Sequence, residues 1–124
     1  MLRPSDHNVW IVDWCYSIFE PAQTGQSFRA YNEKFSAPEV AERKPPLPSS
    51  DLYSAGKCMV FSLGGDPVTL TMPSGVDERI ARFIGFCVRP SPIQRAQDAC
   101  EMYGKLYKLR EEVFGPHEFR EFQM

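Results

Sequence analysis

The segment from about Asp51 to Leu63 constrains the fold of this chain most, because it is apolar almost all round. A serine pair precedes it and can cap a helix, and Gly64 and Gly65 end that helix. Its apolar residues are Leu52, Tyr53, Ala55, Met59, Val60, Phe61 and Leu63. A helix that is apolar on every side is normally buried, so the sequence predicts that this helix lies at the centre of the fold.

Two more long helices follow this segment. Asp77 begins the first, whose apolar residues recur at intervals of three and four up to Cys87. After an Arg-Pro-Ser-Pro step, the last helix is predicted from about Ile93 to Phe114, where a Gly-Pro pair stops it. We therefore expect three principal helices around the first of them.

The first third of the chain has a different pattern. The run from Asn8 to Asp13 is β-branched and aromatic, which predicts a short strand that ends on a carboxylate. The residues from Trp14 to Phe35 have no sustained period and collect loop-forming residues, so a long loop is expected there. A short helical turn is predicted at 37–42, where a proline can occupy the first turn.

Length and composition fit a single domain. The chain has 124 residues, of which 43% are hydrophobic, and this is enough for one core. The fold class expected is mainly α, with one short strand and one long loop. The predicted organisation is a strand in 1–13, a loop in 14–36, a helical core in 37–114 and a tail in 115–124.

Charge and cysteine usage narrow the function classes. Fourteen basic and sixteen acidic residues give a net charge of −2, so no basic surface for nucleic acid or an anionic membrane is expected. No apolar run is long enough to span a membrane and the first residues lack a signal sequence, which favours the cytoplasm. The four cysteines are expected to be buried free thiols, with a disulfide framework as the alternative.

Four short motifs occur in a specific order along the chain. They are Asp13-Trp14-Cys15, Phe35-Ser36-Ala37-Pro38-Glu39, Asp51-Leu52-Tyr53-Ser54-Ala55-Gly56 and Ser91-Pro92-Ile93-Gln94-Arg95. In this order and spacing they resemble the C-terminal lobe of a protein kinase from the activation segment onward. The resemblance runs from about Val9 to Phe114, and it implies a kinase-like fold in which 14–36 is an activation-type loop.

The resemblance implies a role for each matching residue. Asp13 matches the aspartate that binds the magnesium ion bridging the β- and γ-phosphates of ATP. Glu39 and Arg95 match a structural ion pair that ties the end of the activation loop to the last helices. Asp51 matches an aspartate that accepts hydrogen bonds from the backbone of the catalytic loop. For Asp13, an ordinary carboxylate at a strand end remains the alternative.

Several departures from the family pattern bear on activity. Cys15 stands where the family usually has glycine, and Asn32 stands where it usually has threonine. The chain also lacks the Gly-rich loop, the strand lysine with its helical glutamate, and the His-Arg-Asp catalytic loop. We therefore expect no catalytic residues and no cofactor for this chain alone, and Mg-ATP only if an N-terminal lobe completes it.

The sequence thus predicts the C-terminal-lobe portion of a protein-kinase-like protein that is inactive on its own. The alternative is a non-catalytic helical protein–protein interaction module derived from such a lobe. The missing half would leave one face of the central helix uncovered, so a protein partner or self-association is expected there. Tyr103 and Tyr107 lie one turn apart and either mark a contact surface or flank the core.

Two features of the irregular segments stay open. Thr24, Ser27 and Tyr31 are either phosphorylation sites that order the loop or ordinary polar loop residues. The stretch Pro45-Pro46-Leu47-Pro48 is either a polyproline ligand or a rigid connector before the central helix. Neither alternative changes the predicted fold.

Overall fold

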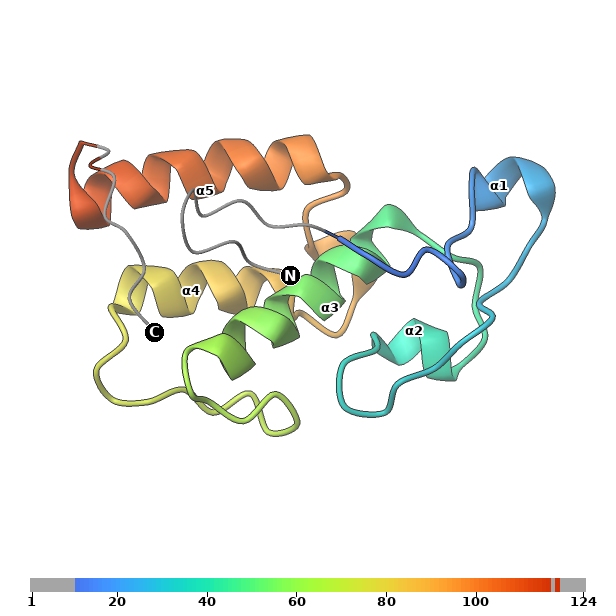
Figure 1. Ribbon diagram of the computed structural model, residues 1–124, viewed down its shortest axis with the longest axis horizontal. Coiled ribbons are helices and arrows are strands. Elements are labelled where there is room, and N and C mark those ends of the chain that lie inside the picture. Colours follow the sequence, from blue (N-terminus) through green and yellow to red (C-terminus); the bar gives the residue numbers. More distant parts are fainter. Residues whose placement is uncertain (1–10, 117, 119–124) are drawn as a thin grey trace.

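The computed structural model describes residues 11–116 and residue 118, and this part of the chain is mainly helical, as the sequence predicts (Figure 1). Its helical elements are α1 (Pro21–Thr24), α2 (Pro38–Ala41), α3 (Pro48–Ser62), α4 (Glu78–Cys87), the 3-10 turn η1 (Pro92–Gln94) and α5 (Ala99–Phe114). Within the described residues, the extended pairing found is an isolated bridge between Asp66 and Thr71.

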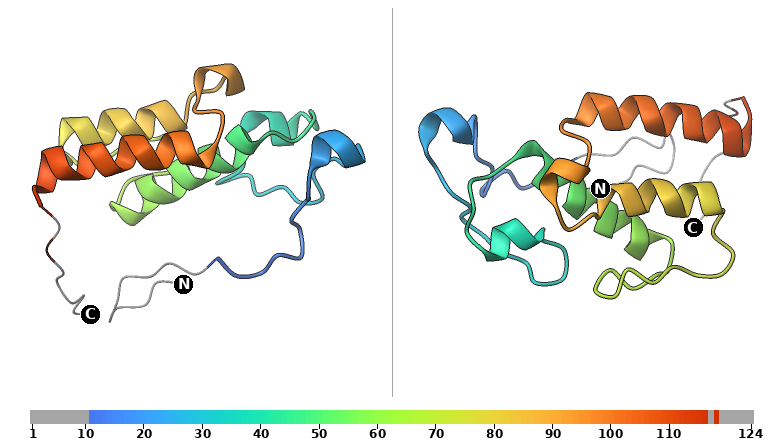
Figure 2. Two further views of the ribbon diagram at one scale, coloured as in Figure 1. Left: turned by 90° about the horizontal axis from the view of Figure 1, so that it is seen from above. Right: turned by 180° about the vertical axis from the view of Figure 1, so that it is seen from behind.

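The three long helices form the body of the fold. Helix α4 packs against both α3 and α5. Helices α4 and α5 run antiparallel, and α3 crosses them at an angle (Figure 1). The short helices α1 and α2 lie near the beginning of α3, at the opposite end of the molecule from the end of α5 (Figures 1 and 2).

The hydrophobic core lies where α2, α3, α4 and the beginning of α5 meet. Its buried members are Ala37, Val40, Tyr53, Cys87, Val88, Ala96 and Met102. Val60 of α3 and Ile84 of α4 are also buried and are the largest of the fully buried side chains, so the core depends on how closely these helices approach each other.

Helix α3 begins three residues earlier than predicted. Pro48 occupies its first position, where the fixed φ of proline suits a helix and no amide hydrogen is needed. The preceding Leu47 is extended and makes no side-chain cap bond. The predicted serine cap is therefore wrong. The predicted end is confirmed, because Leu63 closes the helix and Gly64 follows with a φ of +82°.

The beginning of α4 is confirmed and that of α5 is not. The Asp77 side chain caps α4 by accepting a hydrogen bond from the Arg79 amide at 2.8 Å. The last helix begins at Ala99 rather than near Ile93, because Arg95 has an extended backbone that directs its side chain into the interior. Asp98 then caps α5.

Helix α3 is buried on one side rather than on all sides, which corrects the expectation of a wholly buried central helix. Tyr53, Gly56 and Val60 are buried, whereas Phe61 remains 56% exposed and Cys58 is exposed. The reason is that α4 and the residues around α2 cover one face of α3 and leave the other open. The apolar circumference exceeds what the described residues can cover.

The predicted strand falls mostly on residues outside the described part of the chain. Of the run from Asn8 to Asp13, residues 11–13 are described and have no regular secondary structure. Asp13 itself has a φ of +63°, a left-handed conformation that aspartate tolerates better than most residues. Most of the predicted tail, residues 117 and 119–124, also lies outside the described residues.

The cysteine expectation is corrected in part. All four cysteines are free thiols, but only Cys87 is buried, and Cys15, Cys58 and Cys100 are exposed. Burial raises the pKa of the Cys87 thiol to about 11, so this thiol behaves as a small apolar side chain. Apolar neighbours in the sequence do not show that a cysteine is buried, because adjacent residues of a helix or loop point to different sides.

The contact between α3 and α4 depends on Gly56. A Cβ atom at this position would lie 2.7 Å from the Cβ of Cys87 and 2.8 Å from a methyl of Val88. We predict that Gly56→Ala lowers the free energy of unfolding by about 1–3 kcal/mol, as overpacking does. Gly104→Ala, in α5 with open space around it, is the control and should raise that free energy by about 0.5–1 kcal/mol. Urea denaturation measures both, and equal effects of the two substitutions would contradict the prediction.

Candidate functional site

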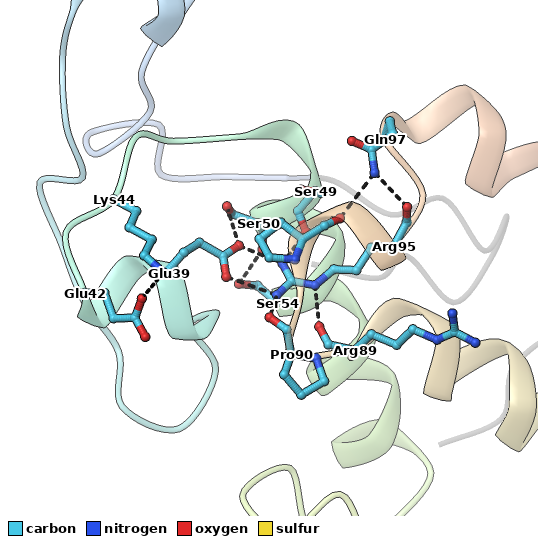
Figure 3. Close-up of polar contacts among 11 residues, drawn as sticks. Glu39, Glu42, Lys44, Ser49, Ser50, Ser54, Arg89, Pro90, Arg95 and Gln97 are labelled. Atoms are coloured by element: carbon cyan, nitrogen blue, oxygen red, sulfur yellow. Dashed lines mark hydrogen bonds and ion pairs between the residues drawn. The ribbon is translucent and has the colours of Figure 1, made fainter.

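A buried ion pair joins two of the sequence-predicted site residues (Figure 3). Arg95 Nη1 lies 2.6 Å from Glu39 Oε1, and Nη2 lies 3.0 Å from Oε2, so the pair is bidentate. Their side chains are 0% and 3% exposed. Fifty-six positions of sequence separate the two residues, so the structure brings together the distant segments that the sequence analysis pairs.

The guanidinium of Arg95 uses every N–H that it has. Its Nε donates to the carbonyl of Arg89 at 2.6 Å. Beyond the two bonds to Glu39, Nη1 donates to the carbonyl of Ser49 at 3.1 Å and Nη2 to that of Pro90 at 2.8 Å. Arg95 therefore holds α2, the first turn of α3 and the connection after α4 in one place.

Local structure places Glu39 at this junction. Pro38 begins α2 at the residue before it, and the preceding loop brings the carboxylate against α3. The hydroxyl of Ser50 donates to Glu39 Oε1 at 2.8 Å. Burial alone would raise the pKa of Glu39, but the hydrogen bonds from Arg95 and Ser50 outweigh it and hold the pKa below its usual range.

Asn32, one of the departures from the family pattern, has a structural role here. Its side-chain oxygen accepts hydrogen bonds from the amides of Lys34 at 3.0 Å and Phe35 at 3.3 Å. The backbone N–H of Asn32 donates to the Ser36 hydroxyl at 2.9 Å. These bonds fold the end of the loop into a tight turn and direct the chain into α2.

Lys57 is a buried cation that the sequence analysis missed. Its Nζ donates to the carbonyl of Lys34 at 2.9 Å and lies 5.5 Å from the ring centre of Tyr53. The contact fastens the end of the loop to the middle of α3. A lysine inside an otherwise apolar helix was the signal available in the sequence. Ser50 carried no such signal, because a serine there reads equally well as a cap.

The other two predicted site residues, Asp13 and Asp51, line one surface hollow of about 640 Å³. The hollow lies between the chain around Asp13 and the beginning of α3, and Trp14, Phe28 and Leu47 supply part of its apolar wall. Asp13 Oδ1 accepts a long 3.4 Å bond from an amide two residues on, in its own turn. The structure thus brings the two carboxylates to one surface feature.

Asp51 has no bonding partner in this hollow. The described structure gives its carboxylate neither a hydrogen bond nor an ion pair, although it lies in the first turn of α3. Removal of water by its surroundings raises the pKa of Asp51. The Asp51 side chain nevertheless remains exposed to solvent, so its carboxylate can accept hydrogen bonds from a group that enters the hollow.

Comparisons with known proteins identify no relative: no family model, no curated protein and no solved structure matches the chain. In the described part of the chain, no three His, Cys, Asp or Glu side chains are grouped so that they could hold a metal ion. A magnesium ion at Asp13 would therefore need ligands from elsewhere. Among the described residues, none of the helices has the length and the apolar character that a membrane-spanning helix requires.

Removing one partner of the buried Glu39–Arg95 pair should cost much more stability than removing one partner of an exposed ion pair. We expect Glu39→Gln or Arg95→Met to lower the free energy of unfolding by about 3–5 kcal/mol, because each leaves a buried charge without its partner. The matched control is Glu101→Gln, which removes an exposed pair with Lys105 and should cost no more than about 1 kcal/mol. Chemical denaturation compares them, and a cost below about 1 kcal/mol at Glu39 or Arg95 would refute the assignment.

The lowered pKa of Glu39 implies that the stability of the fold depends on pH. Because the pKa of Glu39 is lower in the folded than in the unfolded chain, its contribution is complete above the unfolded pKa of about 4.3 and is lost as the pH falls below it. The stability gap between the unsubstituted chain and Glu39→Gln should therefore shrink in acid. Denaturation series between about pH 3 and pH 7 measure this gap. A gap that is constant across the series would contradict the lowered pKa.

Proposed function

We propose that this chain is the C-terminal-lobe portion of a protein-kinase-like protein, and that it transfers no phosphate on its own. The observation that carries the proposal is the buried pair between Glu39 and Arg95. The kinase resemblance implies this pair from two motifs that are far apart in sequence. Burying an arginine is costly unless all of its N–H groups are bonded. Arg95 meets this requirement, and its charged partner is the glutamate that the resemblance selects.

The hollow that contains Asp13 and Asp51 supports the same proposal. The resemblance assigns Asp13 to a magnesium ion and Asp51 to the backbone of the catalytic loop. Here the two carboxylates line one hollow, and Asp51 lacks hydrogen-bond donors. A loop with free backbone N–H groups would supply the donors that Asp51 lacks.

The chemistry of phosphoryl transfer explains why the chain alone would be inactive. The reaction requires a loop that holds the phosphates, a base for the acceptor hydroxyl and ligands for magnesium. Asp13 can offer one hard oxygen ligand, which is too little to hold magnesium without further carboxylates or phosphates. In a completed protein, Asp13 would bind the ion, Asp51 would position the catalytic loop, and the Glu39–Arg95 pair would hold the end of the activation-type loop.

A second candidate function is a non-catalytic helical interaction module derived from such a lobe. The observation that favours it is the outer face of α5, where Tyr103 and Tyr107 are 69% and 48% exposed with ring centres 6.4 Å apart. Leu106 beside them is 43% exposed. Exposed aromatic residues of this kind are enriched in protein–protein interfaces.

Affinity capture with the 124-residue chain tests the proposal against this alternative. Immobilised chain should retain, from an extract of its own source, a protein with a Gly-rich loop and a His-Arg-Asp motif. Asp51→Asn should weaken retention by about tenfold or more, because an amide replaces a charged acceptor of backbone hydrogen bonds. Glu111→Gln, an exposed carboxylate on α5, is the control and should leave retention unchanged. Calorimetry with ATP and Mg²⁺ should detect no magnesium-dependent binding to the chain alone.

Three outcomes would count against the proposed kinase portion. Magnesium-dependent ATP binding by the chain alone would contradict its incompleteness. Retention of a partner without the two motifs, unaffected by Asp51→Asn, would favour the interaction module. Failure to retain any partner at micromolar concentrations would leave the exposed hollow without the occupant that the proposal requires.

A further inference from the structure

An apolar groove lies at the end of the molecule where α3 ends, α4 begins and α5 ends. It has a volume of about 370 Å³, and its walls include Met59 and Leu63 from α3, Phe83 from α4, and Leu109 and Phe114 from α5. Figure 1 shows these three helix ends on one side of the structure. The groove is distant from the hollow of Asp13 and Asp51, which lies at the beginning of α3.

The groove is uncovered among the described residues. Phe114 is 71% exposed, and Leu106 and Leu63, which also line it, are 43% and 39% exposed. Exposed apolar side chains that are scattered singly are ordinary, but here they surround one concave surface. Such a surface normally has an occupant, because covering it removes apolar area from water.

We propose that the groove binds the C-terminal segment of the same chain, residues 117–124. The position of the segment along the chain favours it. Helix α5 ends at Phe114, which itself lines the groove, and the chain changes direction at Gly115 with a φ of +73°. Eight residues span at most about 26–29 Å when extended, more than enough to reach from this point across a groove of this volume.

The segment and the groove are also chemically complementary. The C-terminal segment carries two phenylalanines, Phe119 and Phe122, and the groove walls are apolar and aromatic. Their separation of three residues is one that a helical turn or a polyproline conformation places on one side of a chain. Two aromatic side chains of this size bring enough apolar surface to cover exposed residues such as Phe114 and Leu106.

One residue of the groove wall has a buried polar atom without a partner. Arg110 is the charged residue among the described residues that line the groove, and its Nε is buried without a hydrogen-bond partner. Buried N–H groups almost always have an acceptor, so an acceptor from outside the described structure is expected. The C-terminal segment supplies a candidate in Glu121, which lies between the two phenylalanines.

Attachment to the same chain favours this occupant over a second copy or another protein. A segment joined to α5 by two residues reaches the groove at an effective concentration of about millimolar, well above the protein concentration in solution.

Amide hydrogen exchange on the full 124-residue chain tests the proposal. We expect the amides of residues 119–124 to exchange about tenfold more slowly than those of an unstructured peptide of the same sequence. The double substitution Phe119→Ala and Phe122→Ala should abolish this protection. The matched control, Arg120→Ala with Gln123→Ala, changes the same segment at its polar positions and should retain it.

A variant in the groove separates docking from local structure in the segment. Phe114→Ser replaces a largely exposed side chain, so the fold should persist, which the amide protection of α3 and α4 verifies. Protection of residues 119–124 should fall about tenfold in this variant as well. Glu121→Gln should reduce protection by a few-fold, because it replaces the charged acceptor for Arg110 with a neutral one.

Light scattering of the same samples completes the test. The proposal requires a monomer at low micromolar concentration with a protected segment. Unprotected amides at 119–124, or protection that survives Phe114→Ser, would overturn it. A dimer in which protection of the groove rises with protein concentration would also overturn it, since a second copy would then be the occupant. A groove that is protected only when another protein is added would overturn it as well.

Discussion

The bond network around Arg95 is the constraint on which the rest of the structure depends. A guanidinium that is wholly removed from water must satisfy all of its N–H groups, and here Glu39 and three backbone carbonyls do so. Those carbonyls belong to the first turn of α3 and to the connection after α4. The position of α2, the start of α3 and the path of the chain between α4 and α5 are therefore fixed together, because a shift of any of them leaves a buried N–H group of Arg95 without an acceptor.

This constraint also explains where the long helices lie. Arg95 has an extended backbone that directs its side chain inward, so the last helix does not begin at this residue. It begins after Asp98, whose side chain caps it. The connection before it is pulled against α3, which brings the end of α4 so close that position 56 has room only for a glycine. One buried interaction thus sets the spacing of α3 and α4, and the small core between them follows from it.

The sequence predicted features that depend on local chemistry. Proline, glycine and aspartate marked most helix ends, and the three long helices follow from them. Within the loop predicted at 14–36, the structure contains the short helix α1, which the sequence did not predict. What it did not predict depends on distant partners. The hydroxyl of Ser50 bonds Glu39 rather than its own helix end, and Lys57 is buried because a carbonyl 23 residues away accepts its bond. The pairing of Glu39 with Arg95 was expected only through a family resemblance, because no local pattern joins residues so far apart.

Two surfaces of different chemistry remain open in the described structure, and their difference matters for function. The hollow of Asp13 and Asp51 presents two exposed carboxylates, which suit hydrogen-bond donors or cations. The groove at the other end needs apolar side chains and one acceptor for Arg110. A single occupant suited to one surface would therefore be unsuited to the other. An occupant of the hollow and a segment that covers the groove can therefore bind at the same time, without competition between them.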